Sequence, residues 1–312
     1  MNTALIYHPI YLKHDTGPHH PERASRLQAI LRKLQKTGLI DRLKVIEPPK
    51  ASIEDITLVH SRDYVLSIKD ICKNNDHANL DSDTVISRDS FQAALFAAGA
   101  VIKGIDAVFN GEINNAFCMV RPPGHHARPS QAMGFCIFNN IAIGARYIQK
   151  KYDKNRILII DWDVHHGNGT EEIFYQDPSV LYISVHQYPH YPGTGPKESI
   201  GEGKGRGFNL NIPMQAGSGD DEYIKVFNEI IIPKISSFKP EFILISAGFD
   251  GHKDDPLSNL NITEKGYYEM TAMLKDTAKS YSENRIISVL EGGYNLFSLA
   301  NSVNSHLEAF VL

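Results

Sequence analysis

The chain has 312 residues, of which 42% are hydrophobic and 22% charged, and this composition excludes a disordered or fibrous protein. Its net charge of −4 provides no basic surface for direct nucleic-acid binding, so we expect no nucleic-acid partner. No unbroken apolar run reaches about 18 residues, so we also expect no membrane span.

Two further features of the sequence indicate where the protein works. The three cysteines are far apart and form no CxxC pair, which is typical of reduced thiols rather than of a disulfide framework. The first residues lack the basic start and apolar core of a signal peptide. We therefore expect a cytoplasmic location.

Short apolar runs rich in isoleucine and valine alternate with longer amphipathic segments along the chain. The runs predict buried strands at 3–7, 116–120, 156–160, 180–185, 241–246 and 285–290. The longer segments predict helices at 26–36, 90–109, 134–152, 220–238 and 263–281, with N-caps at Ser218 and Thr263. This alternation predicts a single α/β domain over residues 1–312, with a central, mostly parallel sheet flanked by helices.

Polar, glycine-rich turns follow five of the six predicted strands. In chain order these turns are RPPGHH (121–126), DWDVHHGNG (161–169), VHQYPHYPGTG (185–195), AGFDGHKDDP (247–256) and EGGYN (291–295). The carboxyl ends of parallel strands meet at the same edge of a sheet, where ligands bind. We therefore expect the five turns to form one active site.

The turn that follows the third strand has the spacing of a metal site. Asp161, Asp163 and His165 alternate, so a continuing strand would project them to the same side. Carboxylates with a neutral imidazole are usual ligands of catalytic Zn²⁺, and Asp250 is the best third ligand. For an Asp-x-His pair taken alone, a structural salt bridge is the alternative.

Two other turns offer groups for acid–base chemistry. His125 and His126 lie on a stiff loop of proline and glycine, where both side chains can point into one cavity. Beside a metal, one imidazole can take a proton from water while the other delivers a proton to the leaving group. Tyr294 follows two glycines and can donate to an oxyanion, although a half-buried loop tyrosine is the alternative.

Together these motifs resemble the histone deacetylase and acetylpolyamine amidohydrolase superfamily. The resemblance covers nearly the whole chain, from HPERASRL (20–27) through GFCIFNN (134–140) to EGGYN, and DWDVHHGNG is closest to the class II branch. It implies an arginase-like, three-layer α/β fold and one catalytic Zn²⁺. The residues implied as zinc ligands are Asp163, His165 and Asp250.

The resemblance also assigns the catalytic groups. His125 and His126 would form the acid–base pair, supported by Asp161 and Asn168 respectively, and Tyr294 would polarise the scissile carbonyl. Because a carboxylate supports His125 and a neutral amide supports His126, we expect His125 to be the more readily protonated imidazole.

A substrate tunnel and one or two K⁺ sites are implied as well. The matching substrate-binding positions are Gly134, Phe135, Tyr191, Asp83, His20, Pro21 and Leu257. The inner potassium site matches Asp161, Asp163, His165 and Ser184, and the outer site matches Phe174, Asp177, Val180 and Phe208. Relatives usually have phenylalanine at the position of Tyr191, so this tunnel has an additional hydroxyl.

The implied function is zinc-dependent removal of acetyl or other acyl groups from the lysine ε-amine of proteins or peptides. Class IIa members have histidine where Tyr294 stands, so the tyrosine favours hydrolytic activity. Polyamine-selective members have glutamate where Leu257 stands, which favours an acyl-lysine substrate. The alternatives are an acetylpolyamine or other small N-acyl amine amidohydrolase, a non-catalytic acyl-lysine binding module, and an arginase-like dinuclear manganese enzyme.

Overall fold

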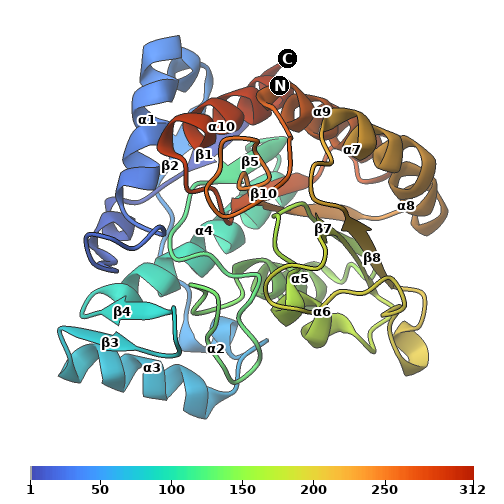
Figure 1. The fold of residues 1–312 in the computed structure, drawn as a ribbon. Helices are drawn as coiled ribbons and strands as arrows, with labels where there is room; N and C mark the ends of the chain where they lie inside the picture. Colours follow the sequence, from blue (N-terminus) through green and yellow to red (C-terminus); the bar gives the residue numbers. More distant parts are fainter. Residues whose placement is uncertain (1) are drawn as a thin grey trace.

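The structure is a computed structural model that describes residues 2–312. Its centre is an eight-stranded sheet in the order β2-β1-β5-β10-β9-β6-β7-β8, and every pair of neighbours is parallel (Figure 1). The strands are β1 (Thr3–Ile6), β2 (Lys44–Ile46), β5 (Asn115–Cys118), β6 (Ile157–Asp161), β7 (Val180–Gln187), β8 (Asn209–Met214), β9 (Phe242–Ala247) and β10 (Ile286–Leu290). The predicted parallel α/β fold is therefore confirmed, and all six predicted strands are present.

The two strands of this sheet that the sequence did not predict lie at its edges. β2 is three residues long and mostly exposed, and β8 contains both buried and half-buried side chains. Neither forms a continuous apolar run, because an edge strand is not covered on all sides. The six predicted strands occupy the interior of the sheet, where every residue is buried.

Helices cover both faces of the sheet, which gives three layers (Figure 1). On one face α4 packs against β1, β5 and β10, and α5 packs against β9; on the other, α10 lies between α1 and α9. The long helices are α1 (Ser25–Thr37), α4 (Ser90–Phe109), α5 (Asn140–Tyr152), α9 (Glu264–Tyr281) and α10 (Leu296–Val311). Shorter ones are α6 (Asn168–Phe174), α7 (Asp220–Val226) and α8 (Ile232–Phe238), with 3₁₀ turns at Pro9–Lys13, Leu39–Arg42 and Gly203–Gly205.

A smaller cluster of elements packs beside the main core. It contains α2 (Ile53–Ile56), α3 (Arg62–Asn74) and the antiparallel pair β3 (His77–Asn79) and β4 (Val85–Ser87). Its buried side chains, among them Tyr64 and Ile68, meet Phe138 from the segment before α5. The loop between β3 and β4 contains Asp83, so this cluster places one of the predicted rim residues.

Two predicted helices differ from the structure in detail. The helix predicted at 134–152 begins only at Asn140, because Gly134 and Phe135 have φ values of +57° and +67° and turn the chain away from a helical path. The helix predicted at 220–238 is present, but a π-helical turn, Phe227–Ile231, interrupts it, and its N-cap is Gly219 rather than Ser218. The Thr263 cap is confirmed by a hydrogen bond from the backbone N–H of Lys265 to its hydroxyl.

Within residues 2–312, one helix is apolar and long enough to cross a membrane as judged by length and composition. This helix is α4, in which Gln92 and Lys103 interrupt the apolar run, and 78% of its most apolar window is buried inside the fold. Its contacts with three central strands identify it as the core helix of this face of the sheet.

Candidate active site

The five turns singled out in the sequence lie side by side at one edge of the sheet. They follow β5, β10, β9, β6 and β7, which are consecutive neighbours in the strand order. Above this edge is a cavity of about 230 Å³, lined by Asp83, His126, Gly134, Phe135, His165, His190, Tyr191, Leu257 and Tyr294. The predicted active-site loops therefore do converge, and all but one of the lining residues were singled out from the sequence.

Asp163, His165 and Asp250 form a buried cluster at the base of this cavity. Their ligand atoms all lie within 4.8 Å of one another. The Nδ1 atom of His165 is 3.0 Å from Oδ1 of Asp163 and 3.3 Å from Oδ2 of Asp250. Among the described residues, Oδ2 of Asp250 is buried without a hydrogen-bond donor. Two buried carboxylates around one imidazole require a positive charge, and this donor set suits Zn²⁺.

Local backbone geometry explains how the cluster can be so tight. Asp163 Oδ1 accepts the backbone N–H of His165 at 2.9 Å, and Asp163 Oδ2 accepts that of Gly292 at 2.8 Å. A Cβ atom at Gly292 would lie 1.9 Å from Oδ2 of Asp250, so only glycine lets the loop after β10 approach the carboxylates.

His125 and His126 contact each other but have different hydrogen-bond partners. The ring centroids are 4.0 Å apart. Nδ1 of His125 is 3.0 Å from a carboxylate oxygen of Asp161, and Nδ1 of His126 is 2.8 Å from the amide oxygen of Asn168. Since the Asn168 oxygen can only accept, Nδ1 of His126 donates and its Nε2 retains a free lone pair.

These partners shift the pKa values of the two imidazoles in opposite directions. Burial opposes the charged form of His125, but the charges of Asp161 and Asp163 outweigh it and raise the pKa to about 10. Burial lowers the pKa of His126 well below its usual value, and the charges of His125 and His165 lower it further. His125 is thus the more readily protonated imidazole, as expected from the sequence.

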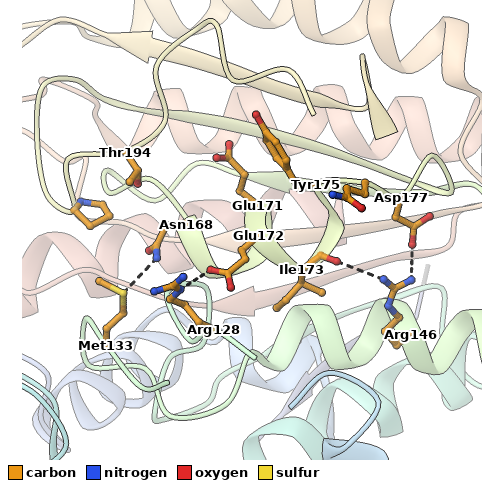
Figure 2. Close-up of a pocket in the computed structure, with 12 residues that line it drawn as sticks. Arg128, Met133, Arg146, Asn168, Glu171, Glu172, Ile173, Tyr175, Asp177 and Thr194 are labelled. Atoms are coloured by element: carbon orange, nitrogen blue, oxygen red, sulfur yellow. Dashed lines mark hydrogen bonds and ion pairs between the residues drawn. The ribbon is translucent and has the colours of Figure 1, made fainter. Parts of the chain in front are cut away.

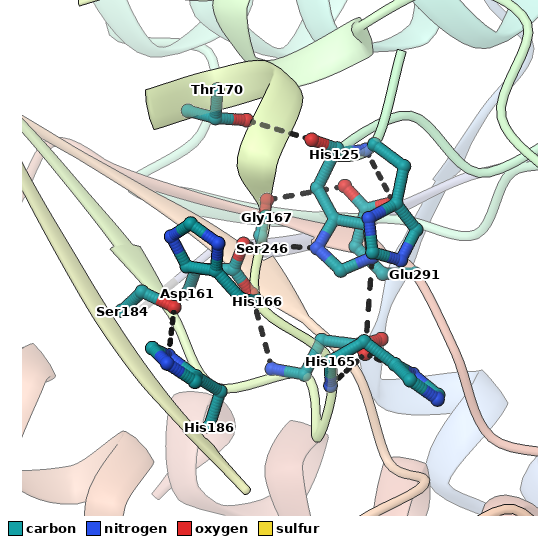
Figure 3. A network of polar contacts seen from close by, with 12 residues as sticks. His125, Asp161, His165, His166, Gly167, Thr170, Ser184, His186, Ser246 and Glu291 are labelled. Carbon is teal, nitrogen blue, oxygen red and sulfur yellow. Dashed lines mark hydrogen bonds and ion pairs between the residues drawn. The ribbon is translucent and has the colours of Figure 1, made fainter. Parts of the chain in front are cut away.

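Glu291 holds the loop of His125 and His126 through backbone hydrogen bonds, a role that the sequence did not predict. Figure 3 shows Glu291 beside His125 and Ser246. Its carboxylate accepts the backbone N–H groups of Gly124 at 2.7 Å and His125 at 3.2 Å, and the Ser246 hydroxyl at 3.1 Å. Burial raises the pKa of Glu291 to about 7. Only the position of Glu291 at the start of EGGYN marked it in the sequence.

Tyr294 lies across the cavity from the histidine pair, between an aromatic ring and a cation. Its ring contacts Phe135, with centroids 5.8 Å apart, and the Arg26 guanidinium lies 5.1 Å from the ring centroid. Arg26 also donates to the carbonyls of Gly293 at 2.6 Å and Glu291 at 2.5 Å, and it pairs with the buried Glu22 at 3.1 Å. The HPERASRL segment therefore supports the tyrosine loop from α1.

The cavity walls include one residue that the sequence analysis missed. His190 precedes Tyr191 in the loop after β7, and its ring stacks on His165 with centroids 5.1 Å apart. Its Nε2 lies 3.0 Å from the carbonyl oxygen of Leu257, so His190 connects two walls of the cavity. Opposite, Gly134 packs so closely on His126 that an added Cβ would lie 2.3 Å from the imidazole.

Only some of the residues predicted at the rim of the substrate tunnel line the cavity. Asp83 and Leu257 line the cavity, whereas His20 and Pro21 do not. His20 instead packs against the outer side of Phe135, with centroids 4.7 Å apart, and its Nε2 lies 3.0 Å from the carbonyl oxygen of Asp83. His20 therefore supports two residues of the cavity, Phe135 and Asp83, and does not line the cavity itself.

The two residue sets matched to potassium sites are assembled but engaged in internal contacts. Asp161 and Ser184 are register partners on β6 and β7, and the Ser184 hydroxyl lies 2.8 Å from Nδ1 of His186. In the outer set, Asp177 pairs with Arg146 at 2.5 Å, and the carbonyls of Phe174 and Phe208 accept backbone hydrogen bonds. Val180, the fourth residue of this set, is the first residue of β7.

A separate surface hollow of about 830 Å³ lies behind Asn168 (Figure 2). The Nδ2 atom of Asn168 contacts the sulfur of Met133 at 3.3 Å, which fixes the amide orientation that presents its oxygen to His126. The two arginines of this hollow are paired with carboxylates, Arg128 with Glu172 and Arg146 with Asp177. Met133, which lines this hollow, therefore supports Asn168 from the side opposite His126.

Comparisons with known proteins agree with this geometry. The histone deacetylase domain family matches residues 20–310. A probable deacetylase from Archaeoglobus fulgidus is 46% identical over 298 residues, covering 95% of this chain and 82% of the relative. A histone deacetylase-like amidohydrolase from Pseudomonas aeruginosa is 37% identical over 314 residues, covering 94% and 82%.

A solved structure gives the same result for the fold. The crystal structure of the HDA15 HD domain superposes with a TM-score of 0.94 at 38% sequence identity, covering 99% of this chain and 88% of that one. The relatives are named as deacetylases or amidohydrolases, which hydrolyse amide bonds. The chain belongs to the histone deacetylase family and is a hydrolase of amide bonds.

Proposed function

We propose that this protein uses Zn²⁺ to remove acetyl or other acyl groups from lysine ε-amines in proteins or peptides. One observation supports this most strongly: the buried cluster of Asp163, His165 and Asp250 opens into a cavity that also contains His126 and Tyr294. A metal-ligand set, a neutral imidazole and a phenol beside one narrow cavity are groups that together can carry out metal-dependent amide hydrolysis.

The three residues fit a single zinc ion. Two carboxylates and one imidazole leave room for water and substrate in the coordination shell, and Oδ2 of Asp250, which accepts no hydrogen bond, is an available ligand atom. Bound there, Zn²⁺ would polarise the amide carbonyl and lower the pKa of a water molecule. A dinuclear manganese centre would need further carboxylate ligands on the cavity side of this cluster, where the side chains beside His165 are the imidazoles of His126 and His190.

The histidine pair is suited to divide the proton transfers. The free Nε2 of His126 accepts the proton of the attacking water, because Asn168 holds the Nδ1 proton and the pKa of His126 is low. His125, whose pKa is about 10, retains a proton beside Asp161 and stabilises the negative charge that develops in the cavity. A protonated imidazole of the pair then delivers the proton to the departing lysine amine.

Tyr294 is the donor for the developing oxyanion. Burial and the charge of Asp250 raise the pKa of its phenol well above the usual value, so the hydroxyl keeps its proton through the working pH range. The adjacent Arg26 and Phe135 restrict the ring on two sides. An oxyanion donor of this kind contributes on the order of 10²–10³ in rate.

The cavity suits an acylated lysine side chain. Phe135, Tyr191 and Leu257 form an apolar passage for methylene groups, and Asp83 at the opening can accept the substrate's backbone N–H. Leu257 offers no charge for the distal ammonium of a polyamine. An acetylpolyamine amidohydrolase remains the alternative, since Asp83 also attracts a cation.

Three further proposals come from the resemblance and the composition. One or two K⁺ ions would bind at the inner and outer residue sets described above. The whole of residues 1–312 would act as one catalytic domain. The protein would work in the cytoplasm, which agrees with cysteines that are all free and buried.

The metal requirement is testable by elemental analysis combined with turnover. We expect one zinc per chain, hydrolysis of an acetyl-lysine peptide, loss of activity with a chelator and recovery when zinc is added back. Asp250→Asn should lose both zinc and activity, whereas Asp254→Asn, which changes an exposed acid nearby, should retain both. Zinc-independent hydrolysis, or peptide binding without hydrolysis by the zinc-loaded protein, would refute the proposal.

A further inference from the structure

Asp255 is a buried carboxylate that makes no hydrogen bond or ion pair with the metal-ligand cluster or the histidine pair. Only 6% of the residue is exposed. It follows Asp250 by five residues, in the loop after β9, and faces the loop that bears Tyr294. Its burial would be costly if its oxygens were not hydrogen-bonded.

Both oxygens of Asp255 accept backbone N–H groups from two walls of the cavity. Oδ2 accepts from Tyr294 at 2.6 Å and from Asn295 at 3.1 Å, and Oδ1 accepts from Leu257 at 3.0 Å. The Asp255 side chain therefore joins the loop that bears Tyr294 to Leu257, which lines another side of the cavity. Burial and then the charge of Asp250 raise the pKa of Asp255 to about 6, and the three N–H groups oppose that rise.

The tyrosine loop needs such a fixed point because of the residues that precede it. Gly292 and Gly293 directly precede Tyr294, and Gly293 has a φ of +121°, a conformation that other residues rarely adopt. Glycine imposes little restriction on the chain, so the position of the next residue depends on hydrogen bonds on both sides of it. Arg26 holds the carbonyl of Gly293 before the tyrosine, and the backbone N–H of Tyr294 itself donates to Asp255.

We propose that Asp255 is a positioning residue that holds the Tyr294 hydroxyl at the scissile carbonyl through the backbone of Tyr294 and Asn295. This inference rests on the proposed hydrolytic role of Tyr294. Asp255 does not line the cavity, so its replacement should affect kcat far more than KM. A displacement of about 1 Å at the tyrosine is enough to cost on the order of 10²-fold in rate.

Asp255→Asn is the most informative variant because it preserves size while removing the charge. An asparagine has one acceptor oxygen, so its NH₂ group must face either the Leu257 N–H or the Tyr294 and Asn295 N–H groups. Asp254→Asn is the matched control, because Asp254 is the preceding residue and its side chain is 56% exposed. If Asp255→Asn does not fold, Asp255→Ser retains a small acceptor and takes its place.

The decisive experiment is a double-mutant cycle with Tyr294→Phe, measured on zinc-loaded protein with an acetyl-lysine peptide. We expect Asp255→Asn to lower kcat by about tenfold to a hundredfold in the wild-type background, with KM changed by less than about threefold. In the Tyr294→Phe background, which has no hydroxyl to position, it should change kcat by less than about threefold. Hydrogen exchange across residues 291–298 should accelerate in Asp255→Asn but not in Asp254→Asn.

Other outcomes separate the two hypotheses. A wild-type kcat for Asp255→Asn, or an equal loss with and without the Tyr294 hydroxyl, would overturn the positioning role while leaving the proposed function intact. If Tyr294→Phe is itself fully active, the proposed role of the tyrosine fails. In that case unchanged hydrogen exchange in Asp255→Asn would overturn the inference, and faster exchange would support the link to the loop.

Discussion

Replacing Gly134 with alanine tests whether the position of His126 controls activity. An alanine Cβ would lie 2.3 Å from Cδ2 and 2.8 Å from Cγ of the imidazole, far inside normal contact distance. The ring would have to move by about 1 Å to restore an ordinary contact, and a misplacement of this size costs on the order of 10²-fold in rate. The φ of +57° adds a backbone cost of about 1 kcal/mol in stability.

Gly111→Ala separates these two effects. Gly111 has a φ of +71°, similar to that of Gly134, but a Cβ there would meet no atom within 4 Å. Both variants should lose about 1 kcal/mol of unfolding free energy from the backbone conformation in urea titrations, and Gly134→Ala should lose about 1–3 kcal/mol more from its clash with His126. Only Gly134→Ala should lose turnover of an acetyl-lysine peptide. If Gly134→Ala retains activity within about threefold of wild type, His126 does not act from the position described.

Three further changes have defined outcomes. Tyr294→Phe should lower kcat by about 10²–10³ with little change in thermal stability. Asn168→Asp places a negative charge beside His126 and raises its pKa, so the acid limb of the pH–kcat/KM profile should move to higher pH; a profile that does not move would contradict the base assignment. Burial alone would raise the pKa of Glu22, but the charge of Arg121 outweighs burial, and the pKa lies well below 4.5. This carboxylate therefore stabilises the fold above pH 4.5, and that stabilisation is lost as the pH falls. Glu22→Gln should cost about 3–5 kcal/mol in urea unfolding at pH 7 and flatten the loss of stability below pH 4.5.

The sequence predicts the interior of the fold better than its edges. The six interior strands are continuous apolar runs because helices cover both of their faces, and that burial is visible in the residues themselves. β2 contains Lys44 and is mostly exposed, so nothing in its composition distinguishes it from a loop. The start of α5 was predicted too early because the apolar spacing of 134–139 suits a helix, while the positive φ of Phe135 is a tertiary constraint.

The candidate site divides in a similar way. Residues that supply reactive groups, such as Asp163 and Tyr294, were predicted because their side chains are unusual at the ends of strands. Glu291 and Asp255 were not, because their role is to accept backbone N–H groups, which no residue pattern displays. His190 was missed for another reason: its contact with His165 joins loops that follow different strands.

The most direct test of the proposed function compares two substrates on the same one-zinc protein. The measurement is kcat/KM for an acetyl-lysine peptide and for N-acetylputrescine, with chelated protein as the blank. The neutral Leu257 and the apolar passage between Phe135 and Tyr191 predict faster hydrolysis of the peptide, by about tenfold or more. Preferential hydrolysis of N-acetylputrescine would replace lysine deacylation with polyamine deacetylation, and hydrolysis of neither by the zinc-loaded protein would contradict the account.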